Sequence, residues 1–191
     1  ALSAFYFKHR LSDDLDFFSF DKVDSIYIHS FIKKLKESLG AKDVHYKKIG
    51  DRNLFFLEWD TGEELKMEFS QYPFNHFTQP KLIETGFGNV KVASLRDIAA
   101  GKLMALLDRF DPKDFVDIFF LLQEFTLRQM VADAEEKFDT KIDDVFIGSE
   151  FAKVKRIEAL PKMFKELTID TLKDFFSEEA MKLGGGIFID K

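Results

Sequence analysis

The chain has 191 residues, of which 46% are hydrophobic and 32% are charged, a composition typical of folded proteins rather than disordered ones. Its 28 basic and 34 acidic residues give a formal net charge of -6, so no overall electrostatic attraction draws it to nucleic acids or anionic membranes. Cysteine is absent, which excludes disulfide bonds and thiolate metal sites. No segment approaches the roughly 20 apolar residues of a membrane helix, so we expect no membrane partner and take the cytoplasm as the default location.

The first half of the chain predicts several strands and one helix. Residues 2–9 resemble the end of a helix, and residues 14–20 resemble a short strand. Residues 23–39 carry apolar side chains at helical spacing and are followed by Gly40, a typical helix stop, so they predict an amphipathic helix. Three further strands, separated by turn-prone residues, are predicted to pair as an antiparallel meander; they lie at 43–50, 53–60 and 64–72.

The pattern becomes helical near residue 94. A looser stretch at residues 73–88 precedes a short strand that starts at Val90 and runs into a helix. Ser94 is predicted to cap this helix, with Asp97 as its capping-box partner. The helices predicted after this point lie at 95–109, 112–124, 127–139, 143–157 and 168–182.

This change of pattern predicts an α+β protein with two lobes. Residues 1–93 are expected to form an α/β lobe and residues 94–191 a helical lobe, with no linker rich in Gly, Ser or Pro between them. A cleft between two such lobes would be a natural place for a ligand.

Two carboxylates are expected to share one face of the strand at residues 14–20. Asp14 and Asp16 are two positions apart, and alternate residues of a strand point to the same face. Like charges this close repel one another unless a cation lies between them, and carboxylate oxygens are ligands that suit Mg²⁺ or Mn²⁺. The alternative is that both are solvated residues on an edge strand.

Glu68 is a candidate for a third carboxylate at this site. It lies on the predicted strand at residues 64–72, and Lys66 shares its face. Pairing of this strand with the strand of Asp14 would bring Glu68 to the same metal ions. The alternative is that Lys66 and Glu68 are exposed residues on a half-buried strand.

A lysine interrupts the apolar stripe of the helix at residues 95–109. Lys102 lies four residues after Ile98 in this stripe, where a charged side chain requires a partner or a function. Arg109 follows on the same face, and the next helix carries Asp114 and Asp117 three residues apart. These residues form either interhelical salt bridges or a group in which Lys102 and Arg109 bind nucleotide phosphates while an aspartate orients them.

Two segments together resemble a known family. "HRLSDDLDFF" at residues 9–18 and "VASLRDIAAGKLMALLDRFDPKDFVDIFFLL" at residues 92–122 resemble the AbiEii/AbiGii toxin family of nucleotidyltransferases, within the DNA polymerase β-like superfamily. The resemblance covers about residues 1–125 and implies a polymerase β-like lobe with a small mixed sheet, followed by helices. It also implies transfer of a nucleoside monophosphate from an NTP to an acceptor, with tRNA as the favoured acceptor, by the toxin of an abortive-infection toxin–antitoxin pair.

The resemblance implies roles for individual residues. Asp14 and Asp16 match the metal-binding Asp-x-Asp motif for Mg²⁺ or Mn²⁺, and Glu68 falls where the superfamily often has a third carboxylate. Lys102 and Asp117 match the lysine and aspartate of the later motifs. The residues expected to contact the nucleotide are Ser12, Lys66, Lys102, Arg109, Lys113 and Asp114.

The sequence departs from the family pattern at its beginning. The family places a Gly-Gly-Thr or Gly-Ser turn directly before the segment that matches residues 1–10, and this chain begins at Ala1 without it. We expect the sequence to start inside a longer protein. Two other functions remain open: a catalytically inactive module that binds a protein partner, and a nucleotidyltransferase that modifies a small molecule.

Overall fold

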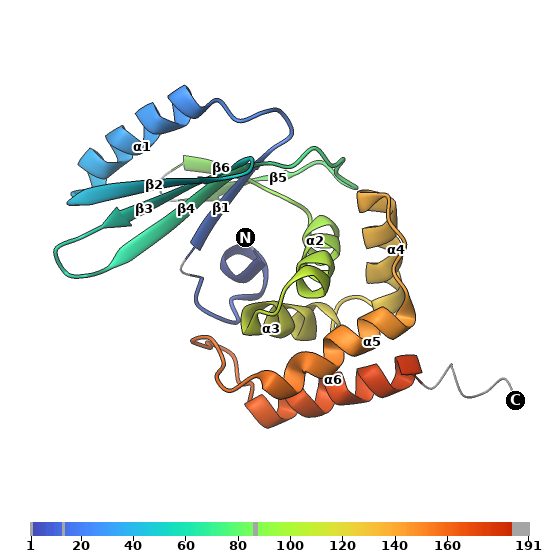
Figure 1. Cartoon of the computed structure of the whole chain (residues 1–191). Coiled ribbons are helices and arrows are strands. Elements are labelled where there is room, and N and C mark those ends of the chain that lie inside the picture. The colour runs from blue at the N-terminus through green and yellow to red at the C-terminus, as the bar shows by residue number, and fades with distance from the viewer. Residues whose placement is uncertain (1, 13, 86–87, 185–191) are drawn as a thin grey trace, which may run out of the picture. The chain divides into compact units, whose positions relative to one another are not determined.

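The computed structural model describes residues 2–12, 14–85 and 88–184, and the chain divides into two compact units (Figure 1). The sheet unit is Ser12–Phe74, and the helical unit combines Ala1–Leu11 with Asn75–Lys191. This division differs from the expected boundary between residues 93 and 94. The reason is that the N-terminal segment contacts the helices at residues 95–108 and 112–121, and such long-range contacts leave no periodic pattern in a sequence.

The sheet unit contains a four-stranded mixed sheet in the order β1-β4-β3-β2. Strands β2, β3 and β4 form the predicted antiparallel meander, and β1 pairs in parallel with β4. The elements of this unit are β1 (Asp14–Ser19), α1 (Ser25–Leu39), β2 (Asp43–Ile49), β3 (Arg52–Glu58) and β4 (Glu64–Gln71). The α+β class and the small mixed sheet are thus confirmed.

Helix α1 covers one face of this sheet (Figure 1). Its buried residues Ile28 and Ile32 pack with apolar side chains of β3 and β4, which are Phe55, Leu57 and Met67. The helix ends at Gly40, whose φ of 64° lies in the left-handed region that a residue without Cβ adopts at little cost. The predicted helix and its stop signal are therefore both present.

The side chain of Asp24 caps α1, and its removal gives a first test of the fold. Its Oδ1 accepts hydrogen bonds from the backbone amides of Ile26 at 2.9 Å and Tyr27 at 3.2 Å. We expect Asp24→Ala to lower the free energy of unfolding by about 1 kcal/mol, because these amides lose their acceptor. Urea unfolding of this variant beside Asp21→Ala, an exposed position outside the helix, would measure the difference. Equal midpoints for the two variants would contradict the assigned cap.

The helical unit holds the remaining elements and a two-stranded hairpin. Its elements are η1 (Leu2–Phe7, π-helical), β5 (Lys81–Thr85), β6 (Gly88–Val92), α2 (Leu95–Asp108), α3 (Pro112–Leu121), α4 (Leu127–Phe138), α5 (Asp144–Ala152), η2 (Lys153–Arg156, 3₁₀) and α6 (Ile169–Gly184). The stretch at residues 73–88 was expected to be loose, yet it contains β5, which pairs antiparallel with β6. A short strand with polar residues and no strict alternation gives little signal in a sequence.

The helices of this unit enclose one apolar core. Leu103 and Leu106 of α2 pack with Phe115 and Ile118 of α3 and with Phe176 of α6, and all five are buried. Helices α5 and α6 lie side by side (Figure 1). Among the described residues, the helices are all too short or too polar to cross a membrane.

Asp97 joins the start of α2 to α4 and to the preceding loop. Ser94 caps α2 as predicted, since its hydroxyl accepts a hydrogen bond from the Asp97 amide at 3.1 Å and donates one to the Asp97 carboxylate at 2.5 Å. The carboxylate also accepts from Lys137 Nζ at 2.8 Å and from the Phe77 amide at 3.0 Å. Burial by itself would raise the pKa of Asp97, but the contacts with Lys137, Ser94 and Phe77 lower it overall.

This lowered pKa predicts a loss of stability in acid. Because the pKa of Asp97 is lower in the folded chain than its unfolded value of about 3.9, the unfolded chain binds the proton first, and the stabilisation is present above that value and lost below it. We therefore expect the urea midpoint to fall as the pH decreases from 5 to 2. The fall should be smaller for Asp97→Asn, which cannot take up this proton. Equal pH dependence of the two proteins would contradict this assignment.

Candidate functional site

The parallel pairing of β1 with β4 brings four charged residues to one face of the sheet. Asp14 lies in register with Lys66, and Asp16 lies in register with Glu68. Residues that lie in register on paired strands share a face of the sheet. The neighbouring side chains along each strand point to the opposite face, where the rings of Phe17 and Phe69 stack with their centroids 4.9 Å apart. The strand pairing that the sequence left open is therefore present, and it places Glu68 beside Asp16.

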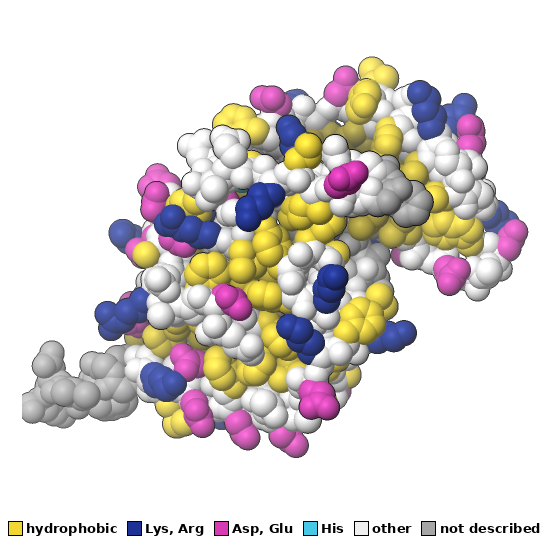
Figure 2. All heavy atoms as spheres, turned by 180° about the vertical axis from the view of Figure 1, so that it is seen from behind, with side chains coloured by type: hydrophobic (Ala, Val, Ile, Leu, Met, Phe, Trp, Pro, Cys, Tyr) yellow, Lys and Arg dark blue, Asp and Glu magenta, His cyan; other side chains and the backbone are white. Residues whose placement is uncertain are grey.

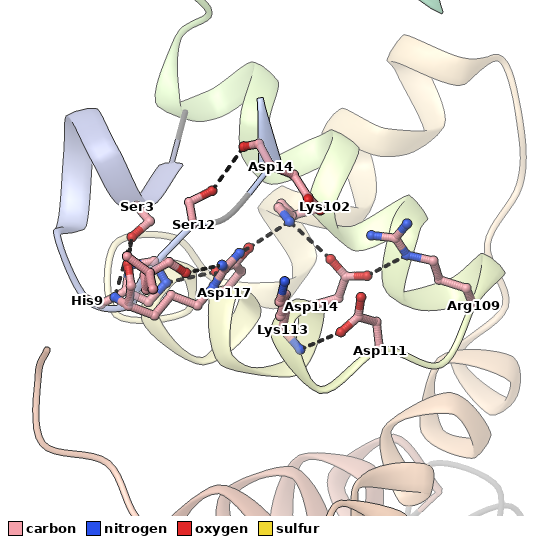
Figure 3. Close-up of polar contacts among 12 residues, drawn as sticks. Ser3, His9, Ser12, Asp14, Lys102, Arg109, Asp111, Lys113, Asp114 and Asp117 are labelled. Carbon is pink, nitrogen blue, oxygen red and sulfur yellow. Dashed lines mark hydrogen bonds and ion pairs between the residues drawn. The ribbon is translucent and has the colours of Figure 1, made fainter. Parts of the chain in front are cut away.

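Asp14 already has a cation beside it. Lys66 Nζ lies 3.2 Å from Asp14 Oδ2, with about a quarter of the Lys66 side chain exposed. The hydroxyl of Ser12 donates a 3.4 Å hydrogen bond to the backbone oxygen of Asp14, which leaves the carboxylate itself for other partners (Figure 3). Asp16 is exposed on the same strand. An ammonium in contact with Asp14 shows that this face attracts positive charge.

Glu68 is held by groups that the sequence analysis did not foresee. Arg52 of β3 donates to both of its carboxylate oxygens at 2.6 Å, and Ser70 donates to Oε1 at 2.7 Å. Burial would raise the pKa of Glu68, but Arg52, Ser70 and Lys66 lower it overall, so the carboxylate is ionised at neutral pH. Oε1 thus has two donors, whereas Oε2 accepts from Arg52 and has a second lone pair.

The carboxylates of this face have donor atoms that suit a divalent metal ion. Asp14 and Asp16 supply oxygen ligands of the kind that Mg²⁺ and Mn²⁺ prefer. In the described part of the chain, no group of three or more His, Asp or Glu side chains is already arranged to hold a metal ion. The residue types fit a divalent cation. A metal ion bound here would have to share the carboxylate of Glu68 with Arg52.

A second charged group lies within the helical unit, where α2 meets α3. Lys102 Nζ lies 3.0 Å from Asp114 Oδ1 and 2.6 Å from Asp117 Oδ2 (Figure 3). Arg109 Nε donates to Asp114 Oδ2 at 2.8 Å. The two aspartates share a face of α3 because they are three residues apart, and Asp111 fixes the start of this helix by accepting from the Lys113 amide at 2.8 Å.

Two N-terminal residues complete this group, and sequence reasoning missed both. His9 Nε2 lies 2.8 Å from Asp117 Oδ1, while Arg10 donates to both oxygens of Asp117 at 2.8 Å. His9 is fully buried and Arg10 is 7% exposed. A buried arginine requires an anionic partner, but in the sequence that partner is more than 100 residues away. The pair His9-Arg10 lies close before the Asp-x-Asp segment, but nothing in the sequence indicates its partner.

The electrostatics of this group keep its lysine charged. Asp114 and Asp117 are fully buried, whereas a quarter of the Lys102 side chain and about half of the Arg109 side chain reach solvent. Burial would lower the pKa of Lys102, but Asp117 and Asp114 raise it overall. Burial would raise the pKa of Asp117, but His9, Arg10 and Lys102 bring it far below its usual range. The interhelical salt bridges, one of the two alternatives that the sequence left open, are present, and they include a cation that is partly accessible from solvent.

The sequence as a whole is similar to a known protein family. The sequence matches the model of the family described as "Nucleotidyl transferase AbiEii toxin, Type IV TA system" over residues 1–185. This chain belongs to the AbiEii family. The family and the fold class expected from residues 9–18 and 92–122 are thereby confirmed.

Relatives of this AbiEii-family chain share its fold and part of its sequence. Protein aq_aa25 of Aquifex aeolicus (strain VF5) is 30% identical over 118 residues, which are 61% of this chain and 52% of that protein. The chain therefore spans about half the length of this curated relative. The crystal structure of an H. pylori protein assigned as a nucleotidyltransferase is similar with a TM-score of 0.59 at 18% identity, covering 97% of this chain and 84% of the other. JHP933 of Helicobacter pylori gives a TM-score of 0.56 at 19% identity, with 97% and 81% covered.

Proposed function

We propose that this AbiEii-family chain transfers a nucleoside monophosphate from an NTP to an acceptor hydroxyl, as the toxin of a type IV toxin–antitoxin pair in the cytoplasm. In this reaction the acceptor oxygen forms a bond to the α-phosphorus, the bond to the β-phosphate oxygen breaks, and pyrophosphate and the acceptor proton leave. The observation that carries the proposal is the placement of Asp14, Asp16 and Glu68 on one sheet face, with Asp16 and Glu68 in register on paired strands.

Asp14 and Asp16 would hold Mg²⁺ or Mn²⁺, with Glu68 as a third ligand through Oε2. When bound, the cation would neutralise charge on the phosphates and lower the pKa of the acceptor hydroxyl. Lys66, which lies 3.2 Å from Asp14 Oδ2, would give up this contact when the cation enters. Arg52 keeps Glu68 ionised and fixes the plane of its carboxylate.

The cations of the helical unit would bind the phosphates of the NTP. Lys102 and Arg109 are the partly exposed cations of the group around α2 and α3, and Asp114 and Asp117 orient them. Ser12, Lys66 and Lys113 are proposed as further nucleotide contacts. These roles follow the chemistry of phosphoryl transfer, in which the protein acts mainly through positioning and charge.

RNA, and tRNA in particular, is the acceptor we propose. Support comes from basic residues around η2 and the loop after it: Lys155, Arg156, Lys162 and Lys165 are exposed, while Lys153 forms an ion pair with Glu150. Charges of both signs are scattered over the face in Figure 2, so an RNA contact would be local rather than spread over a large basic surface. A cognate antitoxin is the proposed protein partner, in keeping with the family.

A labelling experiment tests the function. The protein would be incubated with each α-labelled NTP, Mg²⁺ or Mn²⁺ and total tRNA, beside the double variant Asp14→Ala/Asp16→Ala. Label that reaches RNA with the wild-type protein and not with the variant would support the proposal and identify the nucleotide. If the wild-type protein binds NTP without labelling RNA, a small-molecule acceptor becomes the better assignment. If the wild-type protein binds no NTP, the better assignment is a catalytically inactive module that binds a protein partner.

A further inference from the structure

We propose that His9 and Arg10 are positioning residues that act through Asp117 to aim the ammonium of Lys102 at the phosphates of the nucleotide. This inference rests on the proposed function, because the ligand of Lys102 is taken to be the NTP. All four residues lie in the helical unit, and His9, Lys102 and Asp117 are labelled in Figure 3.

Asp117 is fixed in position by two residues from the N-terminal segment. Arg10 Nε and Nη2 donate to its two carboxylate oxygens in a fork, each at 2.8 Å, and this fork fixes the plane of the carboxylate. His9 Nε2 lies 2.8 Å from Oδ1. Since Asp117 is ionised, its oxygens can only accept, so Nε2 of His9 carries the proton and donates.

His9 and Arg10 are themselves held rigidly. The His9 ring is fully buried, with the Phe120 ring at 4.7 Å and the Phe7 ring at 5.8 Å. Its backbone oxygen accepts from the amides of Phe164 and Lys165, at 2.8 and 3.1 Å. Arg10 Nη1 donates to the backbone oxygen of Leu11 at 2.9 Å. Side chains fixed in this way transmit a defined position to Asp117.

Lys102 has one donor left for a ligand. An ammonium group has three N–H donors, and two of them point at Asp114 and Asp117. Both of these carboxylates are fully buried, whereas a quarter of the Lys102 side chain is exposed, so we infer that the third N–H serves a ligand that arrives from solvent. The same geometry prevents the long side chain from rotating freely, so little conformational entropy is lost when an anion binds.

The charge of the group explains why Arg10 is needed. Among the side chains that are ion-paired with Asp114 and Asp117, the cations Arg10, Lys102 and Arg109 outnumber the two aspartates by one. Without Arg10 the charges would balance, and Asp117 would hold Lys102 more strongly inward. Arg10 therefore both fixes Asp117 and keeps Lys102 available for a phosphate.

A double-mutant cycle on binding tests the inference. Dissociation constants of NTP with Mg²⁺, and of tripolyphosphate alone, would be measured by calorimetry for the wild-type protein, Arg10→Lys, Lys102→Gln and the double variant. We expect each single variant to weaken binding by about 10-fold, the equivalent of one charge-assisted hydrogen bond. In the Lys102→Gln background, Arg10→Lys should change binding by less than about 2-fold, because its effect passes through Lys102.

Two further variants complete the design. His9→Gln keeps a donor near Asp117 and should weaken binding less than Arg10→Lys, so it serves where Arg10→Lys does not fold. Arg96→Lys is the matched control, because Arg96 makes the same fork with Asp133, at 2.8 and 2.6 Å, elsewhere in the helical unit. It should leave both dissociation constants unchanged.

The outcomes separate this inference from the proposed function. Equal effects of Arg10→Lys in both backgrounds would assign Arg10 a purely structural role and overturn the inference, whatever the transfer assay shows. Non-additive binding without transfer to any acceptor would support the inference and count against the proposed reaction. A wild-type protein that binds neither NTP nor tripolyphosphate would overturn both.

Discussion

Asp117→Ala is expected to lower the free energy of unfolding by about 3–5 kcal/mol, the largest effect on stability that we predict for a single substitution. The removal of this carboxylate leaves Arg10 and Lys102, both paired with it at 2.6 to 2.8 Å, with one partner fewer in a buried environment. It also deprives His9 of its hydrogen-bond acceptor. Urea unfolding followed by circular dichroism would measure the loss.

Two companion variants make this result interpretable. Asp117→Asn keeps the shape of the side chain and one acceptor oxygen, so it should be less damaging than alanine. Glu179→Ala removes an ion pair with Lys182, whose side chain is two-thirds exposed, and should change the urea midpoint little, because solvent screens such pairs. If Asp117→Ala unfolded at the same urea concentration as Glu179→Ala, the buried network would not stabilise the fold.

Asp16→Asn is expected to reduce nucleotidyl transfer by at least about 10³-fold while the fold stays intact. The substitution removes one negative charge and one metal-binding oxygen from the face shared with Asp14 and Glu68. A metal ion contributes several kcal/mol to the stability of a phosphoryl-transfer transition state, and this free energy corresponds to a rate change of that size. Asp16 is exposed, so its replacement should leave the urea midpoint near that of the wild-type protein.

The matched control for this prediction is Asp60→Asn, an exposed aspartate whose ion-pair partner Lys42 is also exposed. Its transfer rate should equal that of the wild-type protein. The assay would follow label from NTP into acceptor at saturating Mg²⁺ and again with Mn²⁺. Full activity of Asp16→Asn with either metal would remove Asp16 from the catalytic residues.

The sequence predicted those parts of the fold that depend on local signals. Helix α1 begins after a capping aspartate and is followed by Gly40, both within two residues of the expected bounds, and the three strands of the meander are separated by turn-prone residues. Strand β5 was missed because its five residues show no clear period. The expected boundary after residue 93 differs from the division into two compact units, because that division depends on contacts between distant segments.

In the candidate site, too, features that depend on neighbouring residues were predicted, and contacts between distant residues were not. Asp14 and Asp16 are close in sequence and share a strand, so their common face followed from the geometry of a strand alone. His9 and Arg10 contact Asp117, which is 108 and 107 residues away, and no local pattern marks such a contact. Arg52 was missed as the partner of Glu68 because its strand register was not known in advance. Residue types were therefore predictable, while their partners required the structure.

The parallel pairing of β1 with β4 has a consequence for the order of events during synthesis. Asp14 is made early, but its neighbour in register, Lys66, follows 52 residues later, so β1 has no strand to join until the meander is complete. The network around Asp117 likewise connects residue 9 with residue 117. A partly synthesised chain therefore contains Asp14 and Asp16 before the strand that pairs with them has been made. The group around Asp117 therefore cannot form until residue 117 has left the ribosome, long after His9 has been made.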